Sequence, residues 1–154
     1  MPLTSGRPAV STPARSARPS RPGSASGISS ARRPVTDRHR RERMNWDDGQ
    51  ALNEFTAEWA RSVRERDYVP GGGDSSRRAG ERLRAFLLDV AAEPGPVAAA
   101  THGGVTVDLL RTLLGEGVLP RGLLDEGVPS CAVTTVHNLD VIEIASVAHL
   151  WGPL

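Results

Sequence analysis

The first 36 residues limit what this chain of 154 residues can fold into. They form a low-complexity run of Ser, Arg, Pro, Ala and Gly with almost no large apolar side chain to bury. Burial of apolar surface is what offsets the entropy lost when a backbone is ordered. We therefore expect a disordered arm over residues 1–36 and one folded domain over residues 37–154, a usual length for one domain.

Charge divides the chain near the same place. Residues 1–43 contain ten basic and two acidic residues, whereas residues 44–154 contain nine basic and sixteen acidic residues and have a formal charge of −7. A basic arm therefore precedes an acidic body. All nineteen basic residues are Arg, which indicates a coding bias rather than selection for nucleic acid. We expect a solvated arm with no nucleic-acid partner.

Several classes of protein are excluded by composition. The single cysteine, Cys131, cannot form an internal disulfide or a zinc site built on four thiolates. No apolar run is long enough to span a bilayer, and the N-terminus lacks the apolar region of a secretory signal. Six prolines between Pro2 and Pro34 oppose the amphipathic helix of an organelle transit peptide. We expect a cytoplasmic protein without a membrane partner.

Two amphipathic helices are expected in the first half of the domain. The first begins at Gly49 and fades near Arg66, with one apolar face formed by Leu52, Phe55, Trp59 and Val63. The second is capped by Asp74 or Ser75 and runs to about Ala92, before the helix-breaking EPGP of residues 93–96. Its core face comprises Ala79, Leu83, Phe86, Leu87 and Val90.

The second half combines strands with a further helix. Val97–Thr101 is expected to be a buried parallel strand, and residues 105–114 a helix that ends at Gly115. A loop over residues 115–130 includes a helical turn at Leu123–Glu126. Residues 131–137 and 141–147 are β-rich, and the linking NLD predicts a hairpin with Cys131 buried in its first strand. This order predicts an α/β fold with an antiparallel edge.

The stretch THGG, residues 101–104, lies where the expected strand gives way to the helix. In open α/β sheets this is the edge at which ligands bind. Two glycines let an anion approach the backbone, and the helix N-terminus favours negative charge. His102 adds a hydrogen bond, or a positive charge when protonated. The pattern favours a phosphate site, and its alternative is a polar turn whose histidine is satisfied by neighbours.

Five segments together resemble the histidine phosphatase superfamily, the phosphoglycerate-mutase-like enzymes, over roughly residues 38–150. They are RERMNW (41–46), GGGDSSRRAGERLRAFL (71–87), PVAAATHGGVTVDLLRTLLG (96–115), SCAVTTV (130–136) and AHL (148–150). The resemblance implies a partial phosphoglycerate-mutase-like sheet flanked by helices, with a C-terminal β-hairpin. It also implies hydrolysis of a phosphorylated small molecule through a phosphohistidine, with no metal and no cofactor.

The resemblance assigns roles to four residues. His102 matches the second histidine of the family, which helps to form the phosphate pocket, and Gly103 would donate its backbone N–H to the phosphate. Glu42 matches the general acid of the mutase-type branch, and Arg43 would bind the substrate's phosphate or carboxylate. The alternative for Glu42 is a solvated position in a run of charges. Helix capping fully explains Asp74, and His137 and His149 are expected to be structural.

The nucleophilic histidine of the family is missing from this pattern. It belongs to an Arg-His-Gly motif after an apolar strand, well upstream of the general acid. Arg38-His39-Arg40 has no strand before it, no glycine after it, and lies three residues from Glu42, so we do not assign His39 as the nucleophile. We expect a truncated family member that is catalytically impaired on its own. The alternative is a non-catalytic protein that binds phosphoesters or interacts through its basic arm. The oligomeric state and the substrate stay open.

Overall fold

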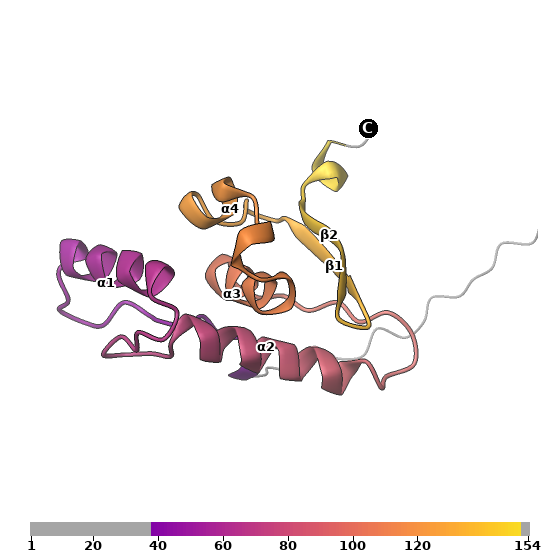
Figure 1. Ribbon diagram of the computed structural model, residues 1–154, viewed down its shortest axis with the longest axis horizontal. Helices are drawn as coiled ribbons and strands as arrows, with labels where there is room; N and C mark the ends of the chain where they lie inside the picture. Colours follow the sequence, from indigo (N-terminus) through magenta and orange to yellow (C-terminus); the bar gives the residue numbers. More distant parts are fainter. Residues whose placement is uncertain (1–37, 152–154) are drawn as a thin grey trace, which may run out of the picture. The chain divides into compact units, whose positions relative to one another are not determined.

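The computed structural model describes residues 38–151, which belong to one unit spanning Val35–Leu154. The arm expected to be disordered, residues 1–36, lies outside the described residues. The elements follow the chain in this order (Figure 1): η1 (Arg38–Arg40), α1 (Leu52–Arg64), α2 (Ser76–Val90), α3 (Gly103–Leu114), η2 (Glu116–Val118), α4 (Arg121–Asp125), β1 (Val133–His137), β2 (Asp140–Ser146) and η3 (Ala148–Leu150). The chain is thus a mixed α/β protein, as its sequence predicts.

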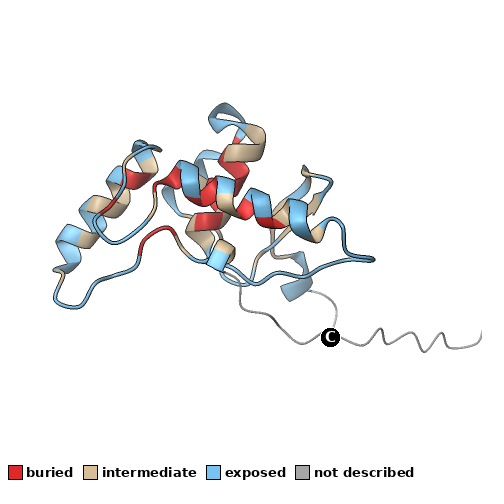
Figure 2. Cartoon of the chain, turned by 90° about the horizontal axis from the view of Figure 1, so that it is seen from below, coloured by how far each residue is buried: buried red, intermediate tan, exposed pale blue. Residues whose placement is uncertain are grey.

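The packing of α2 against α3 forms the core. Ser75 is the N-cap of α2, and its hydroxyl accepts a hydrogen bond from the Arg78 backbone N–H at 3.3 Å. Both helices contain buried residues, which are coloured red in Figure 2. The core consists of Ala79, Leu83, Phe86, Val105 and Leu109, with Leu87, Val90 and Leu113 partly buried against it. The expected core face of α2 is therefore confirmed.

Helix α1 is the less buried of the long helices. It begins at Leu52, which is 58% exposed. Leu52 is therefore not part of a buried face, although the predicted apolar face included it. Phe55, Trp59 and Val63 are half-buried. No helix among the described residues is long and apolar enough to cross a membrane.

The predicted hairpin is confirmed as the antiparallel pair β1–β2. His137 pairs with Asp140, which leaves Asn138 and Leu139 as a two-residue turn with φ of 50° and 69°. Two successive positive φ values are the signature of the type I′ turn, whose twist matches that of the flanking strands. The turn is thus tighter than the three-residue link NLD implied, because Asp140 already belongs to β2.

Cys131 does not lie in a buried strand, contrary to the prediction. It is exposed, has a φ of 60°, and precedes the start of β1 at Val133. Its φ lies outside the extended range, and the paired strand starts only at Val133. The β-rich run therefore begins two residues later than its composition indicates.

The buried strand expected at Val97–Thr101 is also absent. These residues are irregular and exposed, and β1–β2 is the whole of the sheet found among residues 38–151. Apolar composition alone does not make a strand, because a strand needs a neighbour to accept and donate its backbone hydrogen bonds. In this segment the Thr101 hydroxyl donates a hydrogen bond to the Arg40 carbonyl at 2.7 Å.

Gly80 allows the two core helices to approach closely. A Cβ atom at Gly80 would collide with the Thr112 hydroxyl and with the Asp108 carbonyl of α3. The collision is with rigid helix backbone as well as with a side chain, so the helices would have to move apart. A glycine inside a helix is normally a cost of about 1 kcal/mol relative to alanine. Here the close contact of α2 with α3 requires it.

We predict that Gly80→Ala lowers the free energy of unfolding by about 1–3 kcal/mol, although alanine is the better helix former. Overpacking between α2 and α3 causes the loss. Urea unfolding followed by far-ultraviolet circular dichroism measures the loss. The control is the reverse exchange, Ala85→Gly, at an exposed position of α2, where only helix propensity changes. A Gly80→Ala variant more stable than the parent would contradict the close contact.

Candidate functional site

The THGG stretch forms the N-terminus of α3. His102 is the N-cap residue, with extended backbone at φ −108° and ψ 157°, and its carbonyl accepts hydrogen bonds from the Thr106 N–H and hydroxyl. Its imidazole is exposed and, among the described residues, makes no hydrogen bond. The Gly103 N–H likewise has no acceptor within the part of the chain that the structure describes. An exposed imidazole therefore stands beside a free helix N–H.

The Glu42 carboxylate lies directly on this helix end. Its two oxygens accept hydrogen bonds from the backbone N–H of Gly104 at 3.1 Å and of Arg43 at 2.8 Å. Gly104 is 62 residues further along the chain, so the fold brings two of the segments that carry the family resemblance into contact. The positive end of the α3 dipole thus already has an anion, supplied by the protein itself.

The two glycines of this stretch have different surroundings. A Cβ atom at Gly104 would approach the Trp59 ring to 2.6 Å and the Glu42 carboxylate oxygens to 2.7 Å. At Gly103 the nearest atom would be 3.6 Å away, which is ordinary contact. A side chain at Gly104 would therefore collide with Glu42 and Trp59, whereas Gly103 would accommodate a Cβ atom in contact with Val128.

The Arg43 side chain is buried and points into the protein interior. It is 2% exposed, and its Nη1 donates to Asp108 Oδ2 at 2.8 Å. Its Nε donates to the Ser62 hydroxyl at 3.0 Å, and its guanidinium carbon lies 4.0 Å from the centre of the Trp59 ring. The guanidinium thus joins α1 to α3. Its predicted contact with substrate stays a prediction.

Asp108 is the buried acceptor at the centre of this network. Its Oδ2 accepts from Arg43, and its Oδ1 accepts from the Ser76 hydroxyl at 2.6 Å. Burial raises the pKa of the Asp108 carboxyl, and the Arg43 charge and the Ser76 hydrogen bond oppose that rise only in part. The folded chain therefore binds this proton more tightly than the unfolded chain. The ionised form costs stability at pH values above the folded pKa, and that cost is relieved as the pH falls through it.

A small cavity of about 160 Å³ lies beside the α3 N-terminus. Arg43, Trp59, Gly103 and Gly104 contribute to its wall, and α4 with the residues after it closes the other side. A water molecule occupies about 30 Å³ in the liquid, so the cavity has the volume of about five waters. A phosphate group, with five heavy atoms, is of similar size. The lining also includes the basic residue Arg111 and the acidic residues Asp125 and Glu126, so it is mixed in charge. The full lining is Arg43, Trp59, Val63, Gly103, Gly104, Val107, Arg111, Leu123, Leu124, Asp125, Glu126 and Gly127.

The remaining histidines and acids lie elsewhere. His39 belongs to η1, and His137 ends β1, where its Nε2 is 3.2 Å from the Asn138 amide nitrogen. His149 is exposed in η3. Asp74 does not cap α2 as expected, because Ser75 is the N-cap, and it instead forms ion pairs with arginines. No group of three or more His, Cys, Asp or Glu side chains suited to a metal ion occurs within residues 38–151.

Sequence reasoning missed the buried polar partners of Arg43. Asp108 interrupts the apolar run VTVDLL, and a charged residue among positions that face a core requires a buried partner. This interruption of the apolar run could have indicated a buried ion pair at Asp108. The Ser76 and Ser62 hydroxyls had no signal of this kind, because serine is common both at helix starts and on exposed helix faces.

Comparison with known proteins adds no relative. No protein-family model, no curated protein and no solved structure matches this chain.

We predict that Arg43→Met lowers the free energy of unfolding by about 3–5 kcal/mol, because it leaves the Asp108 carboxylate buried without its counter-charge. Urea unfolding provides the measurement. The matched control is Arg61→Met, which removes an exposed pair with Glu65 and should cost less than about 1 kcal/mol. Adding Asp108→Asn to Arg43→Met should restore part of the loss. Equal losses in Arg43→Met and Arg61→Met would show that the buried pair has no special role.

Proposed function

We propose that this chain is a histidine-phosphatase-like protein that binds the phosphate group of a small phosphomonoester at the α3 N-terminus. In this proposal α2, α3 and the β1–β2 hairpin correspond to part of a phosphoglycerate-mutase-like sheet with its helices. The reaction of that family is phosphomonoester hydrolysis through a phosphohistidine. We propose further that the chain alone binds the phosphoester with little or no turnover.

One observation supports this proposal above the others, the contact of Glu42 with the Gly104 N–H at 3.1 Å. The resemblance requires the Glu-Arg segment and the THGG segment to meet at one site, although they are far apart in sequence. Their contact is also specific, because the space at Gly104 is filled by Glu42 and Trp59. The proposal accounts for a contact between two segments that lie 62 residues apart.

The chemistry of binding follows from the groups at the helix end. A phosphate placed over Gly103 would accept the free N–H of that residue and lie along the positive end of the α3 dipole. His102, exposed at the N-cap, would add a hydrogen bond, or a charge when protonated. The negative Glu42 carboxylate would resist a dianion at this distance. Phosphate binding therefore competes with Glu42 for the helix end.

The lack of turnover follows from the histidines. The chain has four, and none is in an Arg-His-Gly motif. Arg38-His39-Arg40 forms η1, and His39 lies in a cavity beside α2 with Arg82 and Ala85. A phosphohistidine route needs an imidazole aligned with the phosphorus atom, opposite the leaving oxygen. The family's second histidine, which His102 matches, helps to bind the phosphate and does not attack it.

We expect the purified full chain to hydrolyse p-nitrophenyl phosphate no faster than the buffer blank. The assay is run with a chelator to silence contaminating metal-dependent phosphatases, beside His102→Ala and the control His137→Ala. Turnover that disappears in His102→Ala but persists in His137→Ala would contradict the expected inactivity. It would show that the site works and that a nucleophile exists, with His39 the first residue to replace.

We predict that Glu42→Gln tightens the binding of phenyl phosphate about fivefold, which corresponds to about 1 kcal/mol of relieved repulsion near the surface. Isothermal titration calorimetry of the full chain measures the change. His102→Ala should weaken the same binding, whereas His137→Ala should leave it unchanged. A Glu42→Gln variant with unaltered or weaker affinity would show that phosphate does not bind at the end of α3.

A further inference from the structure

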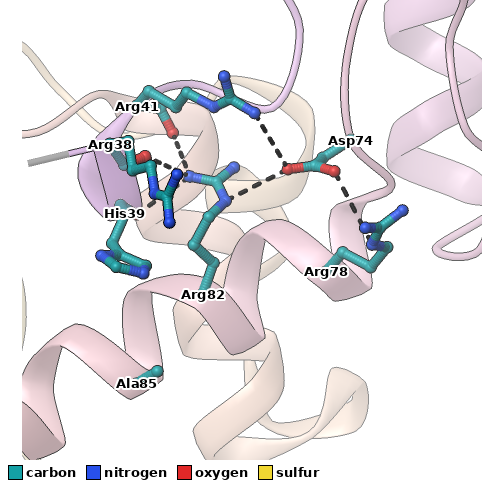
Figure 3. Close-up of a pocket in the computed structure, with 7 residues that line it drawn as sticks. All are labelled: Arg38, His39, Arg41, Asp74, Arg78, Arg82 and Ala85. Atoms are coloured by element: carbon teal, nitrogen blue, oxygen red, sulfur yellow. Dashed lines mark hydrogen bonds and ion pairs between the residues drawn. The ribbon is translucent and has the colours of Figure 1, made fainter.

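A second and larger cavity, of about 410 Å³, lies between η1 and the first half of α2. It shares no lining residue with the cavity at the α3 N-terminus. Its volume falls within the range of about 300–1,000 Å³ typical of small-molecule sites. Figure 3 shows the side chains that converge there from η1, the segment after it, and α2. The lining residues are Arg38, His39, Arg41, Asp74, Arg78, Arg82 and Ala85.

The lining is charged almost throughout. The lining has four arginines and one carboxylate, which gives a net charge of +3 with His39 neutral. Ala85 is the one apolar residue of the lining. The four guanidinium groups of this wall favour an anionic ligand. The cavity suits a compact polar ligand with several negative charges.

Arg82 is the fixed element of this cavity. Its side chain is 14% exposed, and its Nη1 donates to the carbonyls of Arg38, His39 and Arg41 at 3.0–3.2 Å. Three acceptors on one nitrogen hold the η1 turn in place, and thereby hold the guanidinium. Its buried Nη2 has no hydrogen-bond acceptor among the described residues. Its Nε faces Asp74 Oδ2 at 3.2 Å and becomes available to a ligand that displaces that carboxylate.

Asp74 now balances the arginines incompletely. Its Oδ2 lies 3.2 Å from Arg82 Nε and 3.8 Å from an Arg41 nitrogen, and its Oδ1 lies 3.8 Å from Arg78 Nε (Figure 3). The two longer pairs involve exposed arginines, with side chains 63% and 70% exposed. Such pairs contribute little and exchange readily with another anion. Arg41 and Arg78 are therefore free to close on a ligand that reaches Arg82.

We propose that this cavity is a binding site for a small ligand with adjacent phosphate groups, an oligophosphate. Planar guanidinium groups pair with phosphate oxygens through two parallel hydrogen bonds, and a net charge of +3 is better matched by several phosphate groups than by one. Arg82 provides the rigid donor, and Arg41 and Arg78 provide the outer donors. Asp74 acts as the internal counter-ion that the ligand displaces.

The test uses inorganic tripolyphosphate as the probe and calorimetry of the full chain at about 0.15 M salt. The double variant Arg41→Gln/Arg78→Gln removes the outer donors and leaves Arg82 to hold η1. The matched control is Arg64→Gln/Arg84→Gln, which removes the same charge at exposed helix positions outside the cavity. Every variant keeps residues 1–36, so any binding to that arm is common to all of them.

We expect Arg41→Gln/Arg78→Gln to bind tripolyphosphate at least about tenfold more weakly than Arg64→Gln/Arg84→Gln. Asp74→Asn should bind it more tightly than the parent, and orthophosphate should bind the parent at least about tenfold more weakly than tripolyphosphate. Circular dichroism melts establish that each variant is folded. Equal affinity in the two double variants, no measurable binding by the parent, or no gain in Asp74→Asn would overturn the proposal.

Discussion

The ion pair between Arg43 and Asp108 is the interaction on which the described part of the chain depends. Arg43 comes from the segment before α1, and Asp108 faces it from the middle of α3 at 2.8 Å. Ser62 of α1 and Ser76 of α2 bind the same pair through their hydroxyl groups. One buried charge and its partner thereby join all three long helices. An apolar core also links α2 to α3, whereas α1 is joined to α3 through these polar groups.

The position of Glu42 follows from that ion pair. Arg43 is anchored in the interior, so its neighbour in the chain is held at the N-terminus of α3, where it accepts the Gly104 N–H. Arg43 also donates its own backbone N–H to Glu42. The stability of the helix packing and the state of the candidate phosphate site are thus coupled. A change that loosened Arg43 would also release the carboxylate from the helix end.

Much of the local structure could be predicted because it is periodic or has a strong turn signal. The apolar face of α2, the start of that helix at its serine cap, and the β1–β2 hairpin all follow from spacing and turn chemistry. The Val97–Thr101 strand could not be decided in this way. Its composition suits a strand, but pairing depends on a neighbour elsewhere in the chain, and sequence spacing carries no information about that neighbour.

The candidate site was predictable in part for a similar reason. The THGG stretch announces a helix N-terminus, and the structure places it there, with His102 as the N-cap. The contact with Glu42 came only from the resemblance, because no local rule links residues 62 positions apart. No sequence pattern predicted the arginine-lined cavity beside α2. Its members come from two segments, and each alone reads as a solvated run of charge.

The Glu42 carboxylate on the α3 N-terminus can also be regarded as a ligand that is permanently tethered. A group on a short tether acts at an effective concentration on the order of millimolar. A free anion replaces Glu42 at the Gly104 N–H only when its concentration exceeds this effective concentration, or when it binds the helix end more tightly than the carboxylate does. The protein therefore has a built-in threshold. Chloride and other weakly bound anions would leave the carboxylate in place, and only a ligand with further contacts, such as one to His102, would displace it.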